Sequence, residues 1–234
     1  MDLMYLERLS IDIRINDFNR IGTGRKTGHN EYSGGTQDIM ERTAEVARKT
    51  KETVIEVKLD IDGQGKTEID TGIPFFDHML TLFGAHGFFN LYVYAKGDID
   101  VDFHHTVEDV GLVLGNAWDK ALGDRKGIKR YGHAVTPMDE ALCTVTTDLS
   151  KRPFLVYNLP DIGFCAGDSF IPLGKEFFRA FSTQGGMNLH INVHYGENDH
   201  HVIESVFKAA GRSLDMAAQI DPRITGVLST KGAL

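Results

Sequence analysis

Apolar and polar residues follow two different periods along this chain, and the order in which the periods change occurs twice. Alternation over residues 52–60, 67–73 and 90–95 predicts strands. Apolar residues spaced three or four positions apart predict one helix that begins at Pro74 and another over residues 104–122. The first part of the chain therefore has the predicted order β-β-α-β-α.

The same order returns in the second part of the chain. Residues 141–149, 153–159 and 188–195 have the pattern of strands, and residues 173–181 and 200–218 have the pattern of helices. We therefore expect an α+β fold of two tandem, pseudo-symmetric β-β-α-β-α half-domains, with helices covering the sheets.

Two flanking segments lie outside this repeat. Residues 1–42 include GTGRKTGHNEYSGGTQ, which is rich in Gly, Thr and polar residues and predicts a flexible leader. Residues 221–234 form an irregular tail. We predict one domain over residues 43–234, whose two halves span about 44–130 and 131–220.

The motif H-H-x-x-E begins both long predicted helices, at His104 and again 96 residues later at His200. On a helix the two imidazoles and the carboxylate of one copy lie on the same side, where they could bind zinc, manganese or iron. A single copy is equally compatible with a helix start that carries incidental histidines, but two copies argue against that interpretation. His78 precedes the first motif by 26 residues and Glu176 precedes the second by 24, so each half also offers one isolated ligand candidate.

Composition and charge narrow the class of protein. The formal net charge of −8 argues against a nucleic-acid partner but leaves room for a local basic patch that binds a phosphorylated small molecule. No apolar run reaches membrane-spanning length and no signal peptide is evident, so we expect a cytoplasmic protein without a membrane partner. Cys143 and Cys165 could pair, but so few cysteines beside a histidine-rich site favour reduced core thiols.

Several longer segments resemble one enzyme family. GIPFFDHMLTLFGAHG, DFHHTVEDVG, RYGHAVTPMDEAL, NDHHVIESVFKAAGRSL and the terminal STKG are similar to motifs of imidazoleglycerol-phosphate dehydratase. The resemblance covers roughly residues 43–234. It implies dehydration of D-erythro-imidazoleglycerol phosphate to imidazoleacetol phosphate in histidine biosynthesis. It also implies two Mn²⁺ ions per active site and a homo-oligomer of 24 subunits, with active sites where subunits meet.

The resemblance further implies a set of metal ligands. The ligand before the FFR sequence is commonly a histidine in the family, whereas Glu176 stands there in this chain. Glutamate is a competent oxygen donor for manganese, so we expect Glu176 to bind metal, and the alternative is a site one ligand short. The implied ligands are His78, His104, His105, Glu108, Glu176, His200, His201 and Glu204.

The chemistry of the implied reaction explains why paired metals are useful. The hydroxyl leaves from the carbon attached to the imidazole ring, and no carbonyl acidifies the proton on the next carbon. Metal ions on both ring nitrogens would favour an imidazolate, which can expel the hydroxyl and give a diazafulvene-like intermediate. Glu52 matches a substrate-contacting glutamate of the family and is our candidate for proton transfer, although by itself it is typical of a solvated strand start. The implied catalytic residues are Glu52, His78, His105 and His201.

A further implied set binds the substrate and its phosphate. Arginine forks bind phosphate oxygens in pairs, and a Ser-Thr-Lys segment supplies hydroxyls and charge. We expect the tail to close over the substrate, although by composition alone STKG is typical of a frayed end. These residues are Glu52, His86, Arg130, Arg152, Lys208, Ser229, Thr230 and Lys231.

Alternatives stay open for some residues and for the function. Asp139 and Glu140 could orient metal-binding imidazoles, although a structural hydrogen bond is the favoured role. Asp109 is equally compatible with a supporting role at the site and with a solvated helix carboxylate. A dinuclear metallohydrolase and a metal-storage shell protein are the alternative functions.

Overall fold

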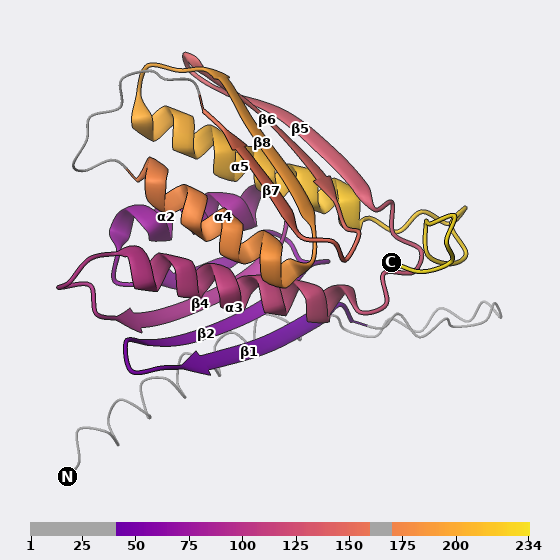
Figure 1. Ribbon diagram of the computed structural model, residues 1–234, viewed down its shortest axis with the longest axis horizontal. Helices are drawn as coiled ribbons and strands as arrows, with labels where there is room; N and C mark the ends of the chain where they lie inside the picture. The colour runs from indigo at the N-terminus through magenta and orange to yellow at the C-terminus, as the bar shows by residue number, and fades with distance from the viewer. Residues whose placement is uncertain (1–40, 160–169) are drawn as a thin grey trace, which may run out of the picture. The chain divides into compact units, whose positions relative to one another are not determined.

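The computed structural model describes residues 41–159 and 170–234 of the chain. Its helices and strands form two groups that follow the same order (Figure 1). The first group is β1 (Thr43–Lys49), β2 (Thr53–Asp60), β3 (Thr67–Asp70), α2 (Pro74–His86), β4 (Asn90–Gly97) and α3 (His104–Leu122). The second group is β5 (Tyr131–Met138), β6 (Ala141–Asp148), β7 (Phe154–Asn158), α4 (Ile171–Gly185), β8 (Asn188–Tyr195) and α5 (Asp199–Ala218).

Each group forms its own four-stranded sheet with the same topology. The strand orders are β1-β2-β4-β3 and β5-β6-β8-β7. In each sheet the first three strands are antiparallel neighbours, and the last strand in the order pairs in parallel. The expected α+β class and the expected repetition of two halves are therefore confirmed.

Each half begins with one strand more than the apolar pattern predicts. The inward positions of β5 carry small or weakly apolar residues, Gly132, Ala134 and Thr136, so that strand lacks the alternation that indicates a half-buried strand. A Cβ on Gly132 would lie 1.9 Å from the carbonyl oxygen of Ser213, which shows that β5 packs directly on the backbone of α5. In β1 no residue is fully buried, because this strand lies at the edge of its sheet.

The helices lie between the two sheets and pair across the halves (Figure 1). Helix α3 packs against α4, and α2 packs against α5. Glycines permit both close approaches, because a Cβ on Gly115 would lie 2.5 Å from the carbonyl oxygen of Phe181 and one on Gly211 would lie 2.4 Å from that of Phe83. This cross-pairing decides which ligand candidates meet.

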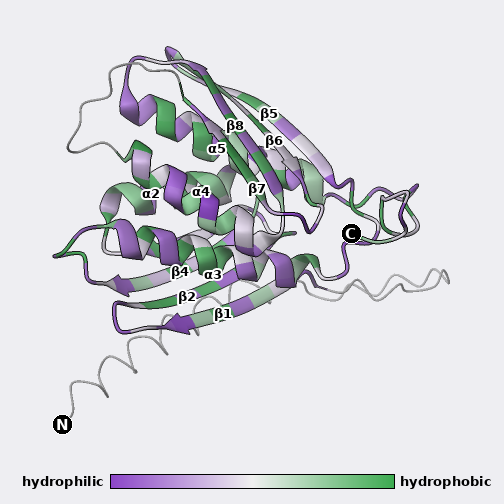
Figure 2. Ribbon diagram, viewed as in Figure 1, coloured by the Kyte–Doolittle hydropathy of each residue, from purple (hydrophilic) through white to green (hydrophobic). Residues whose placement is uncertain are grey.

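The core is continuous between the halves. Hydrophobic residues recur on the helices that lie between the sheets (Figure 2). The ring of Phe76 on α2 contacts that of Phe177 on α4 with centroids 5.4 Å apart, and Trp118 on α3 contacts Phe181 on α4 at 6.1 Å. All four side chains are fully buried, and each contributes about 1.5–3 kcal/mol of burial energy. The two halves therefore stabilise one another.

The structure also bears on two expectations drawn from composition, which concern membrane-spanning helices and the cysteines. In the described ranges, 41–159 and 170–234, no helix is long and apolar enough to cross a membrane. Cys143 is a buried free thiol, and burial raises its pKa to about 12. Cys165 lies outside the described residues.

Candidate functional site

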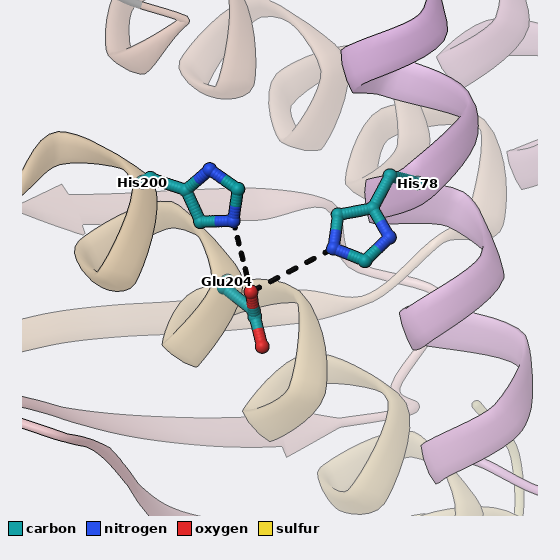
Figure 3. A group of neighbouring side chains, drawn as sticks. All are labelled: His78, His200 and Glu204. Atoms are coloured by element: carbon teal, nitrogen blue, oxygen red, sulfur yellow. Dashed lines mark hydrogen bonds and ion pairs between the residues drawn. The ribbon is translucent and has the colours of Figure 1, made fainter.

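The first cluster of metal-binding side chains joins helices from different halves. His78 comes from α2, and His200 and Glu204 come from the first turns of α5 (Figure 3). Glu204 Oε2 lies 3.1 Å from His200 Nε2 and 3.7 Å from His78 Nε2. Across the part of the chain that the structure describes, this is the one set of three such side chains with donor atoms all within 4.8 Å of one another.

Local features of the chain hold this cluster in place. His200 and Glu204 are four residues apart on one helix face, so their side chains meet. The side-chain oxygen of Asn198 caps α5 by accepting from the backbone N–H of His200 at 2.9 Å and of His201 at 3.4 Å. The side chains of His78 and His200 are each 48% exposed, whereas that of Glu204 is 9% exposed. A ligand can therefore approach from the imidazole side.

A lysine one helical turn after Glu204 on α5 favours the charged form of that carboxyl group. Lys208 Nζ lies 2.5 Å from Glu204 Oε1, the oxygen that does not face the imidazoles. Burial acts to raise the pKa of Glu204, but Lys208 and His200 together lower it below its usual value. Glu204 is therefore held as a carboxylate. The pKa of the nearby His86 is also lowered, by burial first and then by the charges of Lys208 and Arg212.

The pseudo-equivalent side chains form a second, different cluster. His104 and Glu108 come from α3 and Glu176 comes from α4. His104 Nε2 lies 3.5 Å from Glu108 Oε2, but Arg179 Nη2 forms an ion pair with Glu176 Oε2 and lies 3.3 Å from Glu108 Oε1. The structure thus places the guanidinium between Glu108 and Glu176, with His104 beside Glu108.

The second histidine of each motif is held by a carboxylate outside its own motif. His105 Nδ1 lies 3.0 Å from Asp98 Oδ2, and His201 Nδ1 lies 2.6 Å from Glu140 Oε2. These hydrogen bonds are the main cause that raises the pKa of both histidines, and His201 lowers the pKa of Glu140 to about 2. Each carboxylate fixes the orientation of its imidazole, as such partners do for metal-binding histidines.

The turn that carries Glu52 is fastened to α3. Thr53 Oγ1 donates a hydrogen bond to Asp109 Oδ2, and Arg48 forms an ion pair with the same oxygen. Asp109 is therefore buried and bonded, and the interpretation of it as a solvated carboxylate is wrong. Glu52 itself is exposed, and its charge contributes to raising the pKa of His105.

The two arginines of the predicted phosphate set contact one aspartate. Arg130 binds Asp148 through Nε at 2.6 Å and Nη2 at 3.1 Å, and its Nη1 donates to the carbonyl oxygen of Leu228 at 2.6 Å. Arg152 is 65% exposed and lies 3.7 Å from the same carboxylate. Within the chain Arg130 therefore anchors the tail, and Arg152 is the more accessible of the two.

Arg130 lies far from the first cluster within one chain, whereas Lys208 of the same predicted set contacts Glu204. The backbone N–H of Arg130 donates to the carbonyl oxygen of Ala217 at 2.9 Å, close to the end of α5. A rise of about 1.5 Å per residue separates Ala217 from Glu204 by about 20 Å. Figure 1 shows the tail beyond the end of α5 that lies opposite its H-H-x-x-E motif. The residues of the tail that are predicted to bind substrate are Ser229, Thr230 and Lys231.

The sequence analysis did not identify two residues that contact the ligand candidates. Asp98, the partner of His105, belongs to the acidic segment DIDVD, which ends two residues before the first motif, and that spacing is the signal that could have identified it. Arg179 is part of the FFR sequence, but nothing in its spacing indicates that it joins carboxylates of two helices.

Comparisons with known proteins agree on one family. A family model described as imidazoleglycerol-phosphate dehydratase matches residues 71–214. Proteins named imidazoleglycerol-phosphate dehydratase from Desulfosudis oleivorans and Citrifermentans bemidjiense are 65% and 57% identical to the chain. Each match extends over 195 residues and covers 83% of this chain and 100% of the relative.

Two solved structures of proteins with that name are similar to the fold. The enzyme of Staphylococcus aureus subsp. aureus N315 matches with a TM-score of 0.66 and 35% identity, covering 76% of this chain and 99% of that one. The enzyme of Pyrococcus furiosus in complex with (S)-C348 matches with a TM-score of 0.68 and 34% identity, covering 81% and 100%. The chain therefore belongs to the imidazoleglycerol-phosphate dehydratase family and is a hydro-lyase.

Proposed function

We propose that this enzyme dehydrates D-erythro-imidazoleglycerol phosphate to imidazoleacetol phosphate in histidine biosynthesis. Membership of the family supports the reaction and its substrate. The cluster of His78, His200 and Glu204 is the observation that carries the proposal, because it offers nitrogen and oxygen donors at a partly open position. A substrate with an imidazole ring is suited to such a position, since its ring nitrogens are themselves metal ligands.

The donors of the first cluster fit a divalent metal ion. Two imidazole nitrogens and one carboxylate oxygen suit manganese, iron or zinc, and the low pKa of Glu204 keeps its carboxylate ready to bind. We propose that each active site binds two Mn²⁺ ions. When bound, the ions would supply positive charge that acidifies the ring of the substrate and so favours loss of the hydroxyl through a diazafulvene-like intermediate. The proposed ligands are His78, His104, His105, Glu108, Glu176, His200, His201 and Glu204.

The protein's own residues would position the substrate and move its protons. We propose that Glu52 accepts the proton from the carbon next to the one that loses its hydroxyl, and that Asp109 holds its turn. Asp98 and Glu140 would keep the imidazoles of His105 and His201 in one orientation. Because its turn is anchored, the Glu52 carboxylate loses little conformational entropy when it reaches the transition state. A base on a mobile segment would lose more.

A complete active site requires more than one subunit under this proposal. Arg130 lies near the end of α5, about 20 Å along the helix from Glu204, and the three-carbon chain of the substrate cannot span that distance. Residues from neighbouring copies would therefore have to meet, which supports a homo-oligomer. The proposed number of 24 subunits comes from the family resemblance alone. The phosphate and substrate residues proposed are His86, Arg130, Arg152, Lys208, Ser229, Thr230 and Lys231. Location in the cytoplasm remains a prediction from the sequence.

A turnover assay tests the function directly. The metal-stripped protein is supplied with Mn²⁺ and either imidazoleglycerol phosphate or a set of generic phosphoesters. We expect imidazoleacetol phosphate to form only with the first substrate and only when Mn²⁺ is present. Release of inorganic phosphate from the esters would favour a dinuclear hydrolase, and binding of Mn²⁺ without any turnover would favour metal storage.

A further inference from the structure

The repeat allows the two clusters to be compared position by position. Helices α2 and α4 each have a proline in the first turn, Pro74 and Pro172. His78 and Glu176 each stand four residues after that proline and are therefore equivalent. The same alignment makes Thr81 the equivalent of Arg179. The clusters thus differ in one ligand candidate and in the residue one turn beyond it.

In the first cluster the cation and the imidazoles use different carboxylate oxygens. Lys208 lies 2.5 Å from Glu204 Oε1, whereas Glu204 Oε2 faces His200 at 3.1 Å and His78 at 3.7 Å. The oxygen that a metal ion would use is therefore directed toward the two imidazoles. At the position equivalent to Lys208, α3 carries Leu112, so the second cluster has no such lysine.

In the second cluster the cation stands between the candidate ligands. Arg179 Nη2 forms an ion pair with Glu176 Oε2 and also lies 3.3 Å from Glu108 Oε1. The guanidinium thereby joins carboxylates from two helices, as a bridging metal ion would. Because arginine keeps its charge at any ordinary pH, a metal ion must displace it and cannot gain the carboxylates by deprotonation.

We propose that Arg179 is a built-in competitor for the second metal position, so that the two positions of this chain bind Mn²⁺ with unequal affinity and fill in order. The proposal rests on the function proposed above and extends it to the order of metal binding. A histidine at position 176 would not pair with the guanidinium and would leave only the longer contact to Glu108, so the competition depends mainly on Glu176. An ion pair that is half exposed contributes modestly, and with two carboxylates we expect a difference on the order of ten-fold in affinity.

A titration of the metal-stripped, full-length oligomer with Mn²⁺ tests this. The electron paramagnetic resonance signal of free Mn²⁺ reports the number and affinity of bound ions without requiring turnover. Three variants are compared with the natural chain: Arg179→Thr, which places the residue found at position 81; Glu176→His, which places the residue found at position 78; and Arg179→Lys, which keeps the charge. Size-exclusion chromatography confirms that each variant still assembles.

We expect a tighter and a weaker class of site in the natural chain. Arg179→Thr and Glu176→His should tighten the weaker class by about ten-fold and leave the tighter class unchanged, whereas Arg179→Lys should preserve the difference. A single class in the natural chain, or a weaker class that Arg179→Thr leaves unchanged or weakens further, would overturn the proposal. If either occurs while Mn²⁺-dependent turnover persists, the proposed function stands. If the protein binds no Mn²⁺, both proposals fail.

Discussion

The close contact between α2 and α5 at Gly211 gives the sharpest test of how the fold positions the first cluster. A Cβ on Gly211 would lie 2.4 Å from the carbonyl oxygen of Phe83 and 3.0 Å from the backbone nitrogen of Gly87. Ordinary van der Waals contacts of a Cβ atom begin at about 3.4 Å, so Gly211→Ala must separate the two helices by about 1 Å. His78 lies on one of these helices, and His200 and Glu204 lie on the other.

The change in stability follows from two opposing effects. Overfilling a packed contact destabilises by about 1–3 kcal/mol, while replacing glycine by alanine inside a helix stabilises by about 1 kcal/mol. The clashing atoms belong to the backbone and cannot rotate away, so we expect a net loss of about 1–2 kcal/mol in the free energy of unfolding. Mn²⁺ affinity at the first cluster should fall about ten-fold or more, because the donors no longer converge.

Gly115→Ala is the matched control for this variant. Gly115 is the equivalent of Gly211 in the other half, and its added Cβ would lie 2.5 Å from the carbonyl oxygen of Phe181, between α3 and α4. It should lower the midpoint of denaturant unfolding by a similar amount, at equal protein concentration, while the tighter class of Mn²⁺ sites keeps its affinity. If both variants weaken that class equally, or if Gly211→Ala weakens neither the fold nor the metal, the reasoning is refuted.

Three further results are expected. Glu52→Gln should assemble and bind Mn²⁺ normally yet lose turnover by about 100-fold or more, and near-normal turnover would reject Glu52 as the proton carrier. Deleting residues 229–234 should raise KM about ten-fold or more while the unfolding midpoint stays unchanged, because the bond from Arg130 to Leu228 is retained; an unchanged KM would contradict a role in closing the site. In a Cys165→Ser variant, native protein should resist alkylation at about pH 8 and react after denaturation, because burial raises the pKa of Cys143; stoichiometric labelling of the native protein would show that the thiol is accessible.

The strands that the sequence predicts are those with apolar residues on their buried face. β2, β4, β6 and β8 were predicted because each carries regularly buried apolar side chains. The short strands β3 and β7 were also predicted, although neither contains a fully buried residue. β1 and β5 were not, because an edge strand and a strand packed on helix backbone need no large apolar side chains. Their existence depends on hydrogen bonds to β2 and β6, which only the neighbouring strand can supply.

The sequence by itself determines the two halves, their helices and the chemical identity of the donors. Periodicity of 2 and 3.6 residues marks the elements, and the spacing within H-H-x-x-E places a histidine and a glutamate of each motif on one helix face. These are local properties, because they depend only on residues within one or two turns.

Only the tertiary structure decides which donors meet. Cross-pairing of the helices places His78 beside the motif of the other half and sets Arg179 between Glu108 and Glu176. The contact of His78 with Glu204 and that of Arg179 with Glu108 each join helices of different halves. No periodicity encodes such contacts, since they follow from how closely two helix backbones can approach and from which charges that approach brings together.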